Sequence, residues 1–173
     1  MQLTNYNKFI DEQKEYFENN LYQLNDALWK DSFWLKSGVG SNWLLPRGKP
    51  SISFNSINRV KGLSNINIPE DYQQFCKAIL VYSYRQANGK VSPQKLVAEL
   101  LVLKRWFYSL QELTSYSHPT KLSTEILGHA YSLLKDNSSP VNLPDHVGTF
   151  KRLQGIVNKY GFTSKKLEFE VDL

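Results

Sequence analysis

The sequence predicts a mainly α-helical fold, a small helical bundle preceded by an N-terminal helix and a short β-hairpin or irregular arm. Three observations lead to this prediction. Apolar residues recur every three or four positions in five separate stretches, and residues typical of helix ends bracket most of these stretches. The 173 residues, of which 41% are hydrophobic, are enough to build one buried core.

The first predicted helix spans residues 5–30, where Phe9, Phe17 and Leu24 share one face and acidic residues occupy the others. Residues 37–69 are rich in Gly, Pro, Ser and Asn, and they contain two short apolar runs at 43–45 and 52–54. The Pro-Arg-Gly-Lys-Pro run between them can turn the chain. This composition predicts the hairpin or irregular arm.

Two long helices are predicted between residues 69 and 113. Pro69 followed by two acids is typical of a helix start, because proline lacks an amide hydrogen and the acids meet the positive end of the dipole. This helix is predicted to end at Asn88-Gly89, residues that tolerate a left-handed conformation. Ser92-Pro93 begins the second helix, whose apolar face is so broad that we expect it at the centre of the bundle.

Two shorter helices complete the predicted bundle. Ser123 is the expected N-cap of one, and the other is expected to begin at Asp145 and to stop at Gly161. Residues 167–171 alternate apolar and acidic side chains, which predicts a short strand or an extended linker. We therefore expect an N-terminal helix and arm (1–66), a helical core (67–166) and a linker (167–173).

The net charge of +5 is unevenly distributed. Residues 1–31 hold three lysines against six acids, so their net charge is −3 and the remainder carries +8. This asymmetry favours a polyanionic partner, and nucleic acid is the commonest polyanion inside a cell. A single cysteine, Cys76, excludes an intramolecular disulfide framework. The sequence has neither a signal-peptide pattern nor a run of eighteen apolar residues, so we expect a cytoplasmic protein without a membrane partner.

The sequence lacks the common motifs that mark the active site of an enzyme. It contains no Walker-type glycine loop, no G-x-S-x-G and no H-E-x-x-H. His118, His129 and His146 share no helical face, and the acid pair Glu70-Asp71 stands at a predicted helix start, where the helix dipole explains it. We therefore do not expect this chain to be an enzyme, and we expect no cofactor, metal or small-molecule substrate.

Positive side chains are predicted on the exposed sides of the later helices and their connections. In the last helix Lys151, Gly155 and Lys159 are four residues apart, so two ammonium groups flank a position without a side chain, where a phosphate backbone can approach. A solvated helix face explains the same pattern without a partner. The candidate DNA-binding residues are Arg85, Lys90, Lys95, Lys104, Arg105, Lys121, Lys151, Arg152 and Lys159.

The order of the segments resembles that of a known family. Residues 72–113 hold a helix with an aromatic-rich end, a short polar turn and a leucine-rich helix that contains Trp106. The segments TKLSTEILGHAYSLLKD (120–136) and DHVGTFKRLQGIVNKYGFTSKKLEF (145–169) follow. Over about 100 residues this order resembles the N-terminal, SAM-like core-binding region of phage-type integrases, which are tyrosine recombinases. The resemblance is a pattern of helices and not a diagnostic signature.

The resemblance implies that the bundle clamps double-stranded DNA at a recombination site, with sister protomers of the recombination complex as further partners. It also implies a separate catalytic domain, which we expect this chain to lack. Leu127-Gly128-His129 is similar to a motif of that domain, but no H-x-x-R-H precedes it, so we expect neither Tyr131 nor Tyr160 to be a nucleophile. The alternative is a protein-interaction or oligomerisation module, in which the acidic helix 5–30 docks on a basic surface of a sister chain without DNA.

Overall fold

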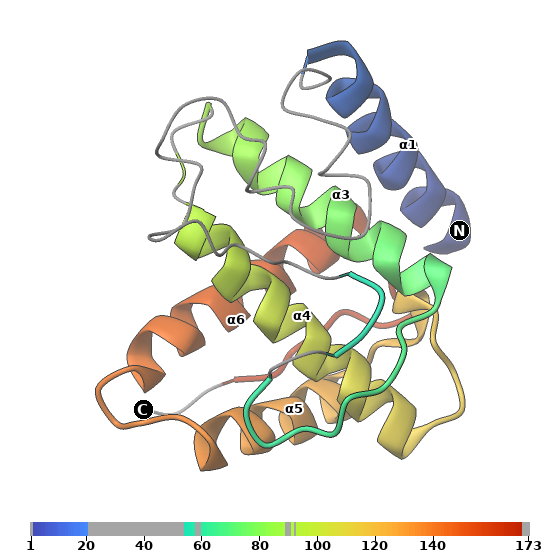
Figure 1. Cartoon of the computed structure of the whole chain (residues 1–173). Coiled ribbons are helices and arrows are strands. Elements are labelled where there is room, and N and C mark those ends of the chain that lie inside the picture. The colour runs from blue at the N-terminus through green and yellow to red at the C-terminus, as the bar shows by residue number, and fades with distance from the viewer. Residues whose placement is uncertain (1, 21–53, 58–59, 89–90, 92, 171–173) are drawn as a thin grey trace.

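The computed structural model describes residues 2–20, 54–57, 60–88, 91 and 93–170. Within these residues the chain is mainly helical, which confirms the predicted fold class of a small helical bundle (Figure 1). The helices are α1 (Gln2–Asn20), α3 (Glu70–Gln86), α4 (Pro93–Leu113), the short 3-10 helix η4 (Pro119–Lys121), α5 (Thr124–Asp136) and α6 (Leu143–Tyr160).

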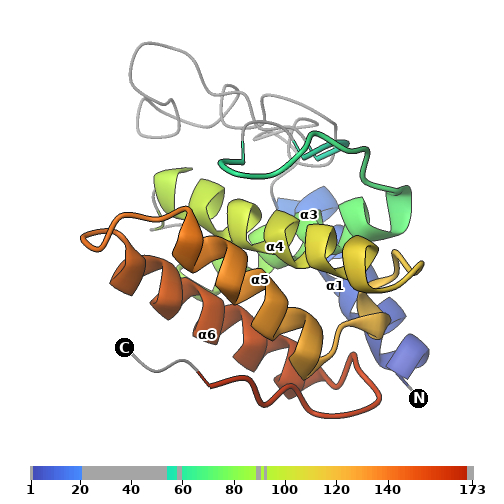
Figure 2. The ribbon, with the colours of Figure 1, turned by 90° about the horizontal axis from the view of Figure 1, so that it is seen from below.

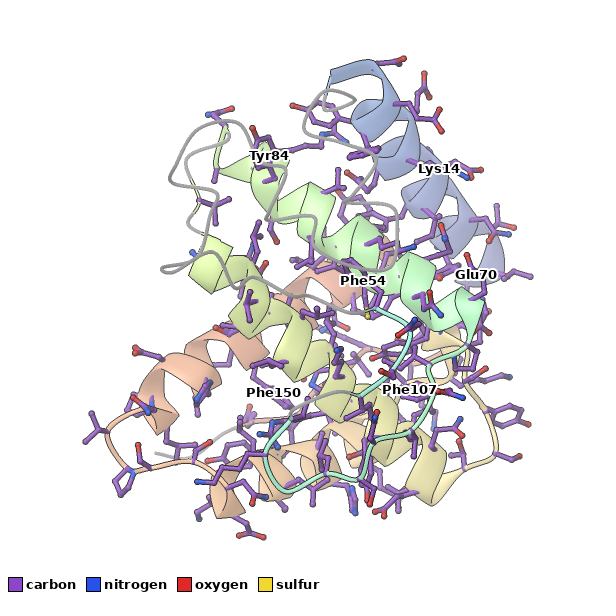
Figure 3. The ribbon with its side chains drawn as sticks, in the orientation of Figure 1. Lys14, Phe54, Glu70, Tyr84, Phe107 and Phe150 are labelled. Carbon is purple, nitrogen blue, oxygen red and sulfur yellow. The ribbon has the colours of Figure 1, made fainter. Side chains whose placement is uncertain are left out.

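Helix α4 lies at the centre of the bundle, as its broad apolar face predicts. It packs against α3, α5 and α6, whereas α1 packs mainly against α3. Figure 2 shows α3 and α4 side by side, with α5 and α6 below them and the segment that precedes α3 above them. Large aromatic side chains fill the interior, among them Phe107 and Phe150, which are labelled in Figure 3.

The first helix is an integral part of this core. Its apolar stripe, which includes Tyr6, Phe9 and Phe17, is buried, and the Tyr6 hydroxyl donates a hydrogen bond to the Asp71 carbonyl, 2.9 Å away. The helix begins at Gln2, three residues before the predicted start, and its predicted end lies outside the described residues. The described parts of the predicted 1–66 and 67–166 units therefore share one core.

Most predicted helix ends are close to the observed ones. Pro69 is the N-cap of α3, whereas the sequence predicts it as the first residue inside the helix. The Ser123 hydroxyl caps α5 by accepting a hydrogen bond from the Ile126 amide. Gly161 ends α6 in the left-handed conformation, with φ 65°. Helix α6 begins at Leu143, two residues before Asp145, because Pro144 can occupy the first turn without an unpaired amide. The predicted cap Ser92 lies outside the described residues.

The described residues of segment 54–68, which are 54–57 and 60–68, cover the far side of α3 (Figure 2). Its apolar residues, including Phe54 and Ile57, are buried, and an antiparallel bridge joins Ser56 to Asn67. The predicted hairpin at 43–54 lies outside the described residues except for Phe54. Because helices cover one side of α3 and this segment covers the other, every residue from 75 to 83 is buried, including Lys77, whose ammonium lies 5.5 Å from the Phe54 ring centre.

The last described residues are extended and lie along α6. The Asn158 amide group bonds both the backbone amide and the carbonyl of Leu167, each at 2.8 Å, and Gln154 bonds Phe169 in the same way at 3.1 Å. Leu167 is buried, and the Phe169 ring packs against Phe150. Residues 167–170 are thus fixed to the bundle, where a strand or an extended linker is predicted.

Candidate nucleic-acid interface

The outer face of α6 carries an exposed stripe of glycines and lysines. Gly148, Lys151, Gly155 and Lys159 follow one another at helical spacing, and all four are exposed. Asp145 is the last acid of the helix, so no carboxylate of α6 itself accompanies these lysines. We call these four residues the α6 stripe.

Within the described residues, neither a close contact nor the backbone conformation requires glycine at the two glycine positions of the α6 stripe. A Cβ atom added at Gly148 or Gly155 meets no atom within 4 Å, and neither residue has a positive φ. Glycine inside a helix costs about 1 kcal/mol relative to alanine, because it loses more backbone entropy on folding. Both glycines lower the stability of α6. Gly155 also leaves a surface without a side chain between Lys151 and Lys159, which another molecule can approach closely.

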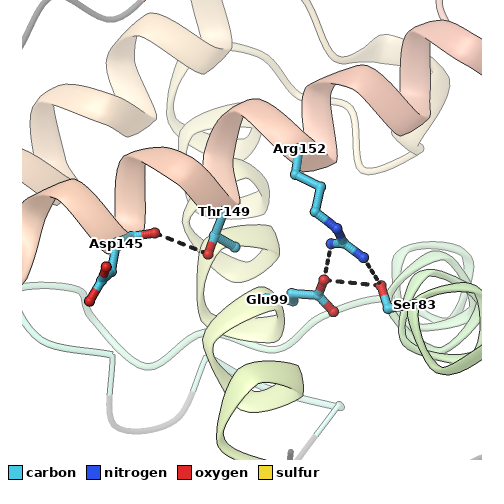
Figure 4. A network of polar contacts seen from close by, with 5 residues as sticks. All are labelled: Ser83, Glu99, Asp145, Thr149 and Arg152. Atoms are coloured by element: carbon cyan, nitrogen blue, oxygen red, sulfur yellow. Dashed lines mark hydrogen bonds and ion pairs between the residues drawn. The ribbon is translucent and has the colours of Figure 1, made fainter. Parts of the chain in front are cut away.

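Beside the α6 stripe, Arg152 belongs to a polar network that joins three helices (Figure 4). One guanidinium nitrogen, Nη1, pairs with Oε1 of Glu99 on α4, and the other, Nη2, donates to the Ser83 hydroxyl on α3 at 2.8 Å. Ser83 also donates to Oε1 of Glu99 at 3.0 Å. Burial raises the pKa of the Glu99 carboxyl, although Arg152 and Ser83 oppose this shift.

Two members of the network, Glu99 and Arg152, line a groove between α4 and α6. The groove has a volume of about 580 Å³, and Gly148 also lines it. Lys95 is exposed, and the Arg152 side chain is 34% exposed. Both cations line the groove together with Gly148, so they adjoin the α6 stripe. Asp145 is the exposed acid of the same groove. The lining residues are Lys95, Ala98, Glu99, Pro144, Asp145, Gly148, Thr149 and Arg152.

Two of the predicted cations contact tyrosine rings where α1, α3 and α6 meet. The Arg85 guanidinium lies 4.3 Å from the Tyr16 ring centre and donates to the Gln13 side chain at 2.9 Å. The Lys159 ammonium lies 5.5 Å from the Tyr160 ring centre and donates to the Tyr82 hydroxyl at 3.3 Å. Arg85 is held within the fold, whereas Lys159 keeps an exposed side chain at the end of the α6 stripe.

The prediction of exposed positions is wrong for Lys104 and Arg105. Their residues are only 2% and 7% exposed, because α4 is enclosed by its neighbours and has no fully solvated face at this turn. Burial lowers the pKa of Lys104 to about 8 and also lowers that of Arg105. Neither side chain belongs to a surface that DNA can reach in this structure.

Lys121 is the last residue of η4, and it is not among the residues that line the groove between α4 and α6. It lines a hollow of about 520 Å³, and a second hollow of about 510 Å³ is lined by Lys165 and Lys166, with Ser123 and Ser164 on both. Sequence reasoning missed Lys165 and Lys166, although the run Ser-Lys-Lys that begins three residues after the helix stop at Gly161 is a usable signal. Lys90 lies outside the described residues.

His118 and His129 make local contacts within the fold, and Cys76 is buried. The His118 ring caps η4, and the His129 ring contacts the Ser109 hydroxyl at 2.8 Å. Burial raises the pKa of the Cys76 thiol to about 12. In the ranges that the structure describes, no group of three or more His, Cys, Asp or Glu residues is arranged to hold a metal ion. None of the described helices is both long and apolar enough to cross a membrane.

No protein-family model, curated protein or solved structure matches this chain. The resemblance to the core-binding region of integrases therefore stays a prediction.

Proposed function

We propose that the chain binds duplex DNA through the α6 stripe, with Lys151 and Lys159 contacting phosphates. The observation that carries this proposal is the pair of exposed lysines on either side of Gly155, on a helix face where the fold itself does not need glycine. Lys95 and Arg152 adjoin the stripe and extend the positive surface toward α4. Lys104 and Arg105 are not part of this positive surface, because both are buried.

The dimensions of the α6 stripe fit a duplex. Lys151 and Lys159 are eight residues apart, which corresponds to about 12 Å along a helix axis. The major groove of B-DNA is also about 12 Å wide, so each ammonium group can meet a phosphate on a different rim of the groove. Each contact strengthens binding by releasing counterions from the phosphates, and contacts of this kind carry little sequence information.

The finer proposal is that this duplex is a recombination site and that the bundle clamps it as part of a tyrosine recombinase. Its support is the resemblance in helix order together with the helical bundle that the structure shows. Sister protomers of a recombination complex would be further partners. The outer face of α1, where Asp11, Glu12, Glu15 and Glu18 are exposed, offers them a negative surface.

An oligomerisation module without DNA binding is the alternative. The apolar stripe of α1 is buried within its own chain, so only the acidic face of α1 is left for a sister chain. Removing α1 would disrupt the core, and neutralising Glu15 and Glu18 to glutamine is the better test. Under the alternative the wild-type chain associates at low salt in sedimentation experiments and the neutralised variant does not.

The proposal is tested by titrating a 25-base-pair duplex at several salt concentrations. We expect the logarithm of the binding constant to fall linearly with the logarithm of the salt concentration, with a slope of roughly −0.9 per phosphate contact. In the Lys151→Gln/Lys159→Gln variant the slope should shrink by about 1.8 and the affinity should drop by at least about tenfold.

The matched control is Lys8→Gln/Lys14→Gln, which removes two exposed lysines that belong to α1 and not to the α6 stripe. This variant should bind the duplex as the wild-type chain does. Absence of duplex binding at low salt, or equal losses in the two double variants, would overturn the proposal.

A further inference from the structure

Arg152 has two possible partners, the Glu99 carboxylate and an anion bound in the groove beside the α6 stripe. Its guanidinium pairs with Glu99, whose residue is fully buried, yet its side chain is 34% exposed and lines the groove beside the α6 stripe. Figure 4 shows the Arg152 side chain reaching from α6 toward Glu99 and Ser83. Because the Arg152 side chain has several rotatable bonds and already lines the groove, we expect another rotamer to place its guanidinium there, whereas Glu99 is fully buried.

We propose that Arg152 is a reserve cation that leaves Glu99 for a DNA phosphate, and that Glu99 thereby limits the affinity of the chain for DNA. This inference rests on the proposed function and deepens it. Arginine forms bidentate pairs with carboxylates and with phosphates alike, so the two anions compete for one guanidinium. Glu99 is a regulatory residue that acts through Arg152 and does not itself contact DNA.

The exchange is coupled to a proton. An ionised carboxylate left buried without its cation is costly, whereas a neutral carboxyl group is tolerated and can still bond Ser83. Burial already raises the pKa of Glu99, so uptake of a proton at this residue accompanies the release of Arg152. DNA binding should therefore take up a proton and strengthen as the pH falls.

The charged and polar groups around Glu99 come from each helix packed against it. Ser83 faces it from α3, Lys95 lies one turn away on α4, and Arg152 faces it from α6. Asp145 lines the same groove. Lys95 favours the ionised form of Glu99, which makes Arg152 and Lys95 the two cations that hold its charge.

The variant Glu99→Gln tests the exchange, because it removes the competing charge and keeps the shape and the hydrogen-bonding oxygen. Its duplex affinity at pH 7.5 should exceed that of the wild-type chain by about tenfold, as loss of one charged hydrogen bond predicts. The salt slope should steepen by about 0.9 for the additional phosphate contact. The double variant Glu99→Gln/Arg152→Gln should lose both gains.

Comparison across pH 5 to 8 isolates the protonation of Glu99. The wild-type affinity should rise toward low pH more steeply than that of Glu99→Gln, because the two proteins differ at position 99 alone. Ser83→Ala is a second variant. It removes the acceptor of Nη2 of Arg152 and also the hydrogen bond that Ser83 donates to Glu99, but it leaves the Glu99 charge in place, so it should raise the affinity by a smaller factor.

The outcomes separate this inference from the proposed function. If Lys151→Gln/Lys159→Gln weakens duplex binding but Glu99→Gln and Ser83→Ala bind as the wild-type chain does, the exchange is wrong and the function stands. If the wild-type chain binds no duplex, both are overturned. Inorganic phosphate is the DNA-free probe: it should shift the Arg152 side-chain NMR signals more in Glu99→Gln than in the wild-type chain, and equal shifts would contradict the exchange.

Discussion

The chain contains the dipeptide Lys-Arg twice within its helices, and the structure treats the two copies in opposite ways. Lys104-Arg105 on α4 is buried, whereas on α6 Lys151 is exposed and Arg152 lines a groove. The sequence context of both pairs predicts an exposed basic face. The number of elements around each helix makes the difference, since α4 packs against three helices and α6 keeps one face open. A positive charge on a helix is therefore evidence of a binding surface only when that helix is peripheral.

The largest expected effect is a loss of stability when a buried side chain of segment 54–68, which covers α3, is removed. Phe54 is fully buried against α3 (Figure 3), so Phe54→Ala should lower the free energy of unfolding by about 3–5 kcal/mol. Val141 is 84% exposed, and Val141→Ala should change the stability by less than about 0.5 kcal/mol. Urea denaturation measures both, and a loss of under about 1 kcal/mol in Phe54→Ala would show that segment 54–68 is not part of the core.

The second effect, on the pH dependence of stability, tests the difference between the buried Lys104 and the exposed Lys151. Burial lowers the pKa of Lys104 to about 8, so the unfolded chain binds this proton more tightly than the folded chain does. The free energy of unfolding contributed by this group therefore rises as the pH increases from about 8 to 10.5. Lys104→Met should be more stable than the wild-type chain by up to about 3 kcal/mol at pH 7, and this advantage should vanish by pH 10.5.

Lys151→Met is the matched control, because its side chain is exposed on α6. Its stability should follow that of the wild-type chain at every pH between 7 and 10.5. A stabilisation of Lys151→Met as large as that of Lys104→Met would contradict the contrast between the buried and the exposed pair. Thermal denaturation followed by circular dichroism at several pH values suffices for both variants.

The smallest effect concerns Gly155, which separates the lysines of the α6 stripe. Gly155→Ala should stabilise the chain by about 1 kcal/mol, since alanine is the better helix former and its Cβ meets no other atom. The same substitution should weaken duplex binding severalfold if a phosphate backbone approaches this position. Stabilisation without any loss of binding would show that the glycine serves another purpose.

The sequence predicts much of the fold because local signals and burial agree there. The Ser123 cap, the Gly161 stop and the central place of the helix after Ser92-Pro93 all follow from short-range patterns that the structure confirms. The predicted hairpin lies outside the described residues except for Phe54. The burial of segment 54–68 above α3 depends on contacts between segments distant in sequence, which no periodic pattern encodes.

The candidate site was predictable only in part, for the same physical reason. Lys151, Gly155 and Lys159 are correctly placed on one exposed face, because α6 is an amphipathic helix with an open side. Lys104 and Arg105 were misplaced, since spacing cannot tell how many neighbours surround a helix. The pairing of Arg152 with Glu99 joins residues that are 53 positions apart, and only the folded chain brings them together.

The central claim is that the exposed cations of α6, and not the buried cations of α4, meet the phosphates of a duplex. The salt dependence of duplex binding by Lys151→Gln/Lys159→Gln and by Lys104→Met tests it most directly. We predict a slope smaller by about 1.8 for the first variant and an unchanged slope for the second. A slope that shrinks for Lys104→Met and stays unchanged for the α6 variant would contradict the claim.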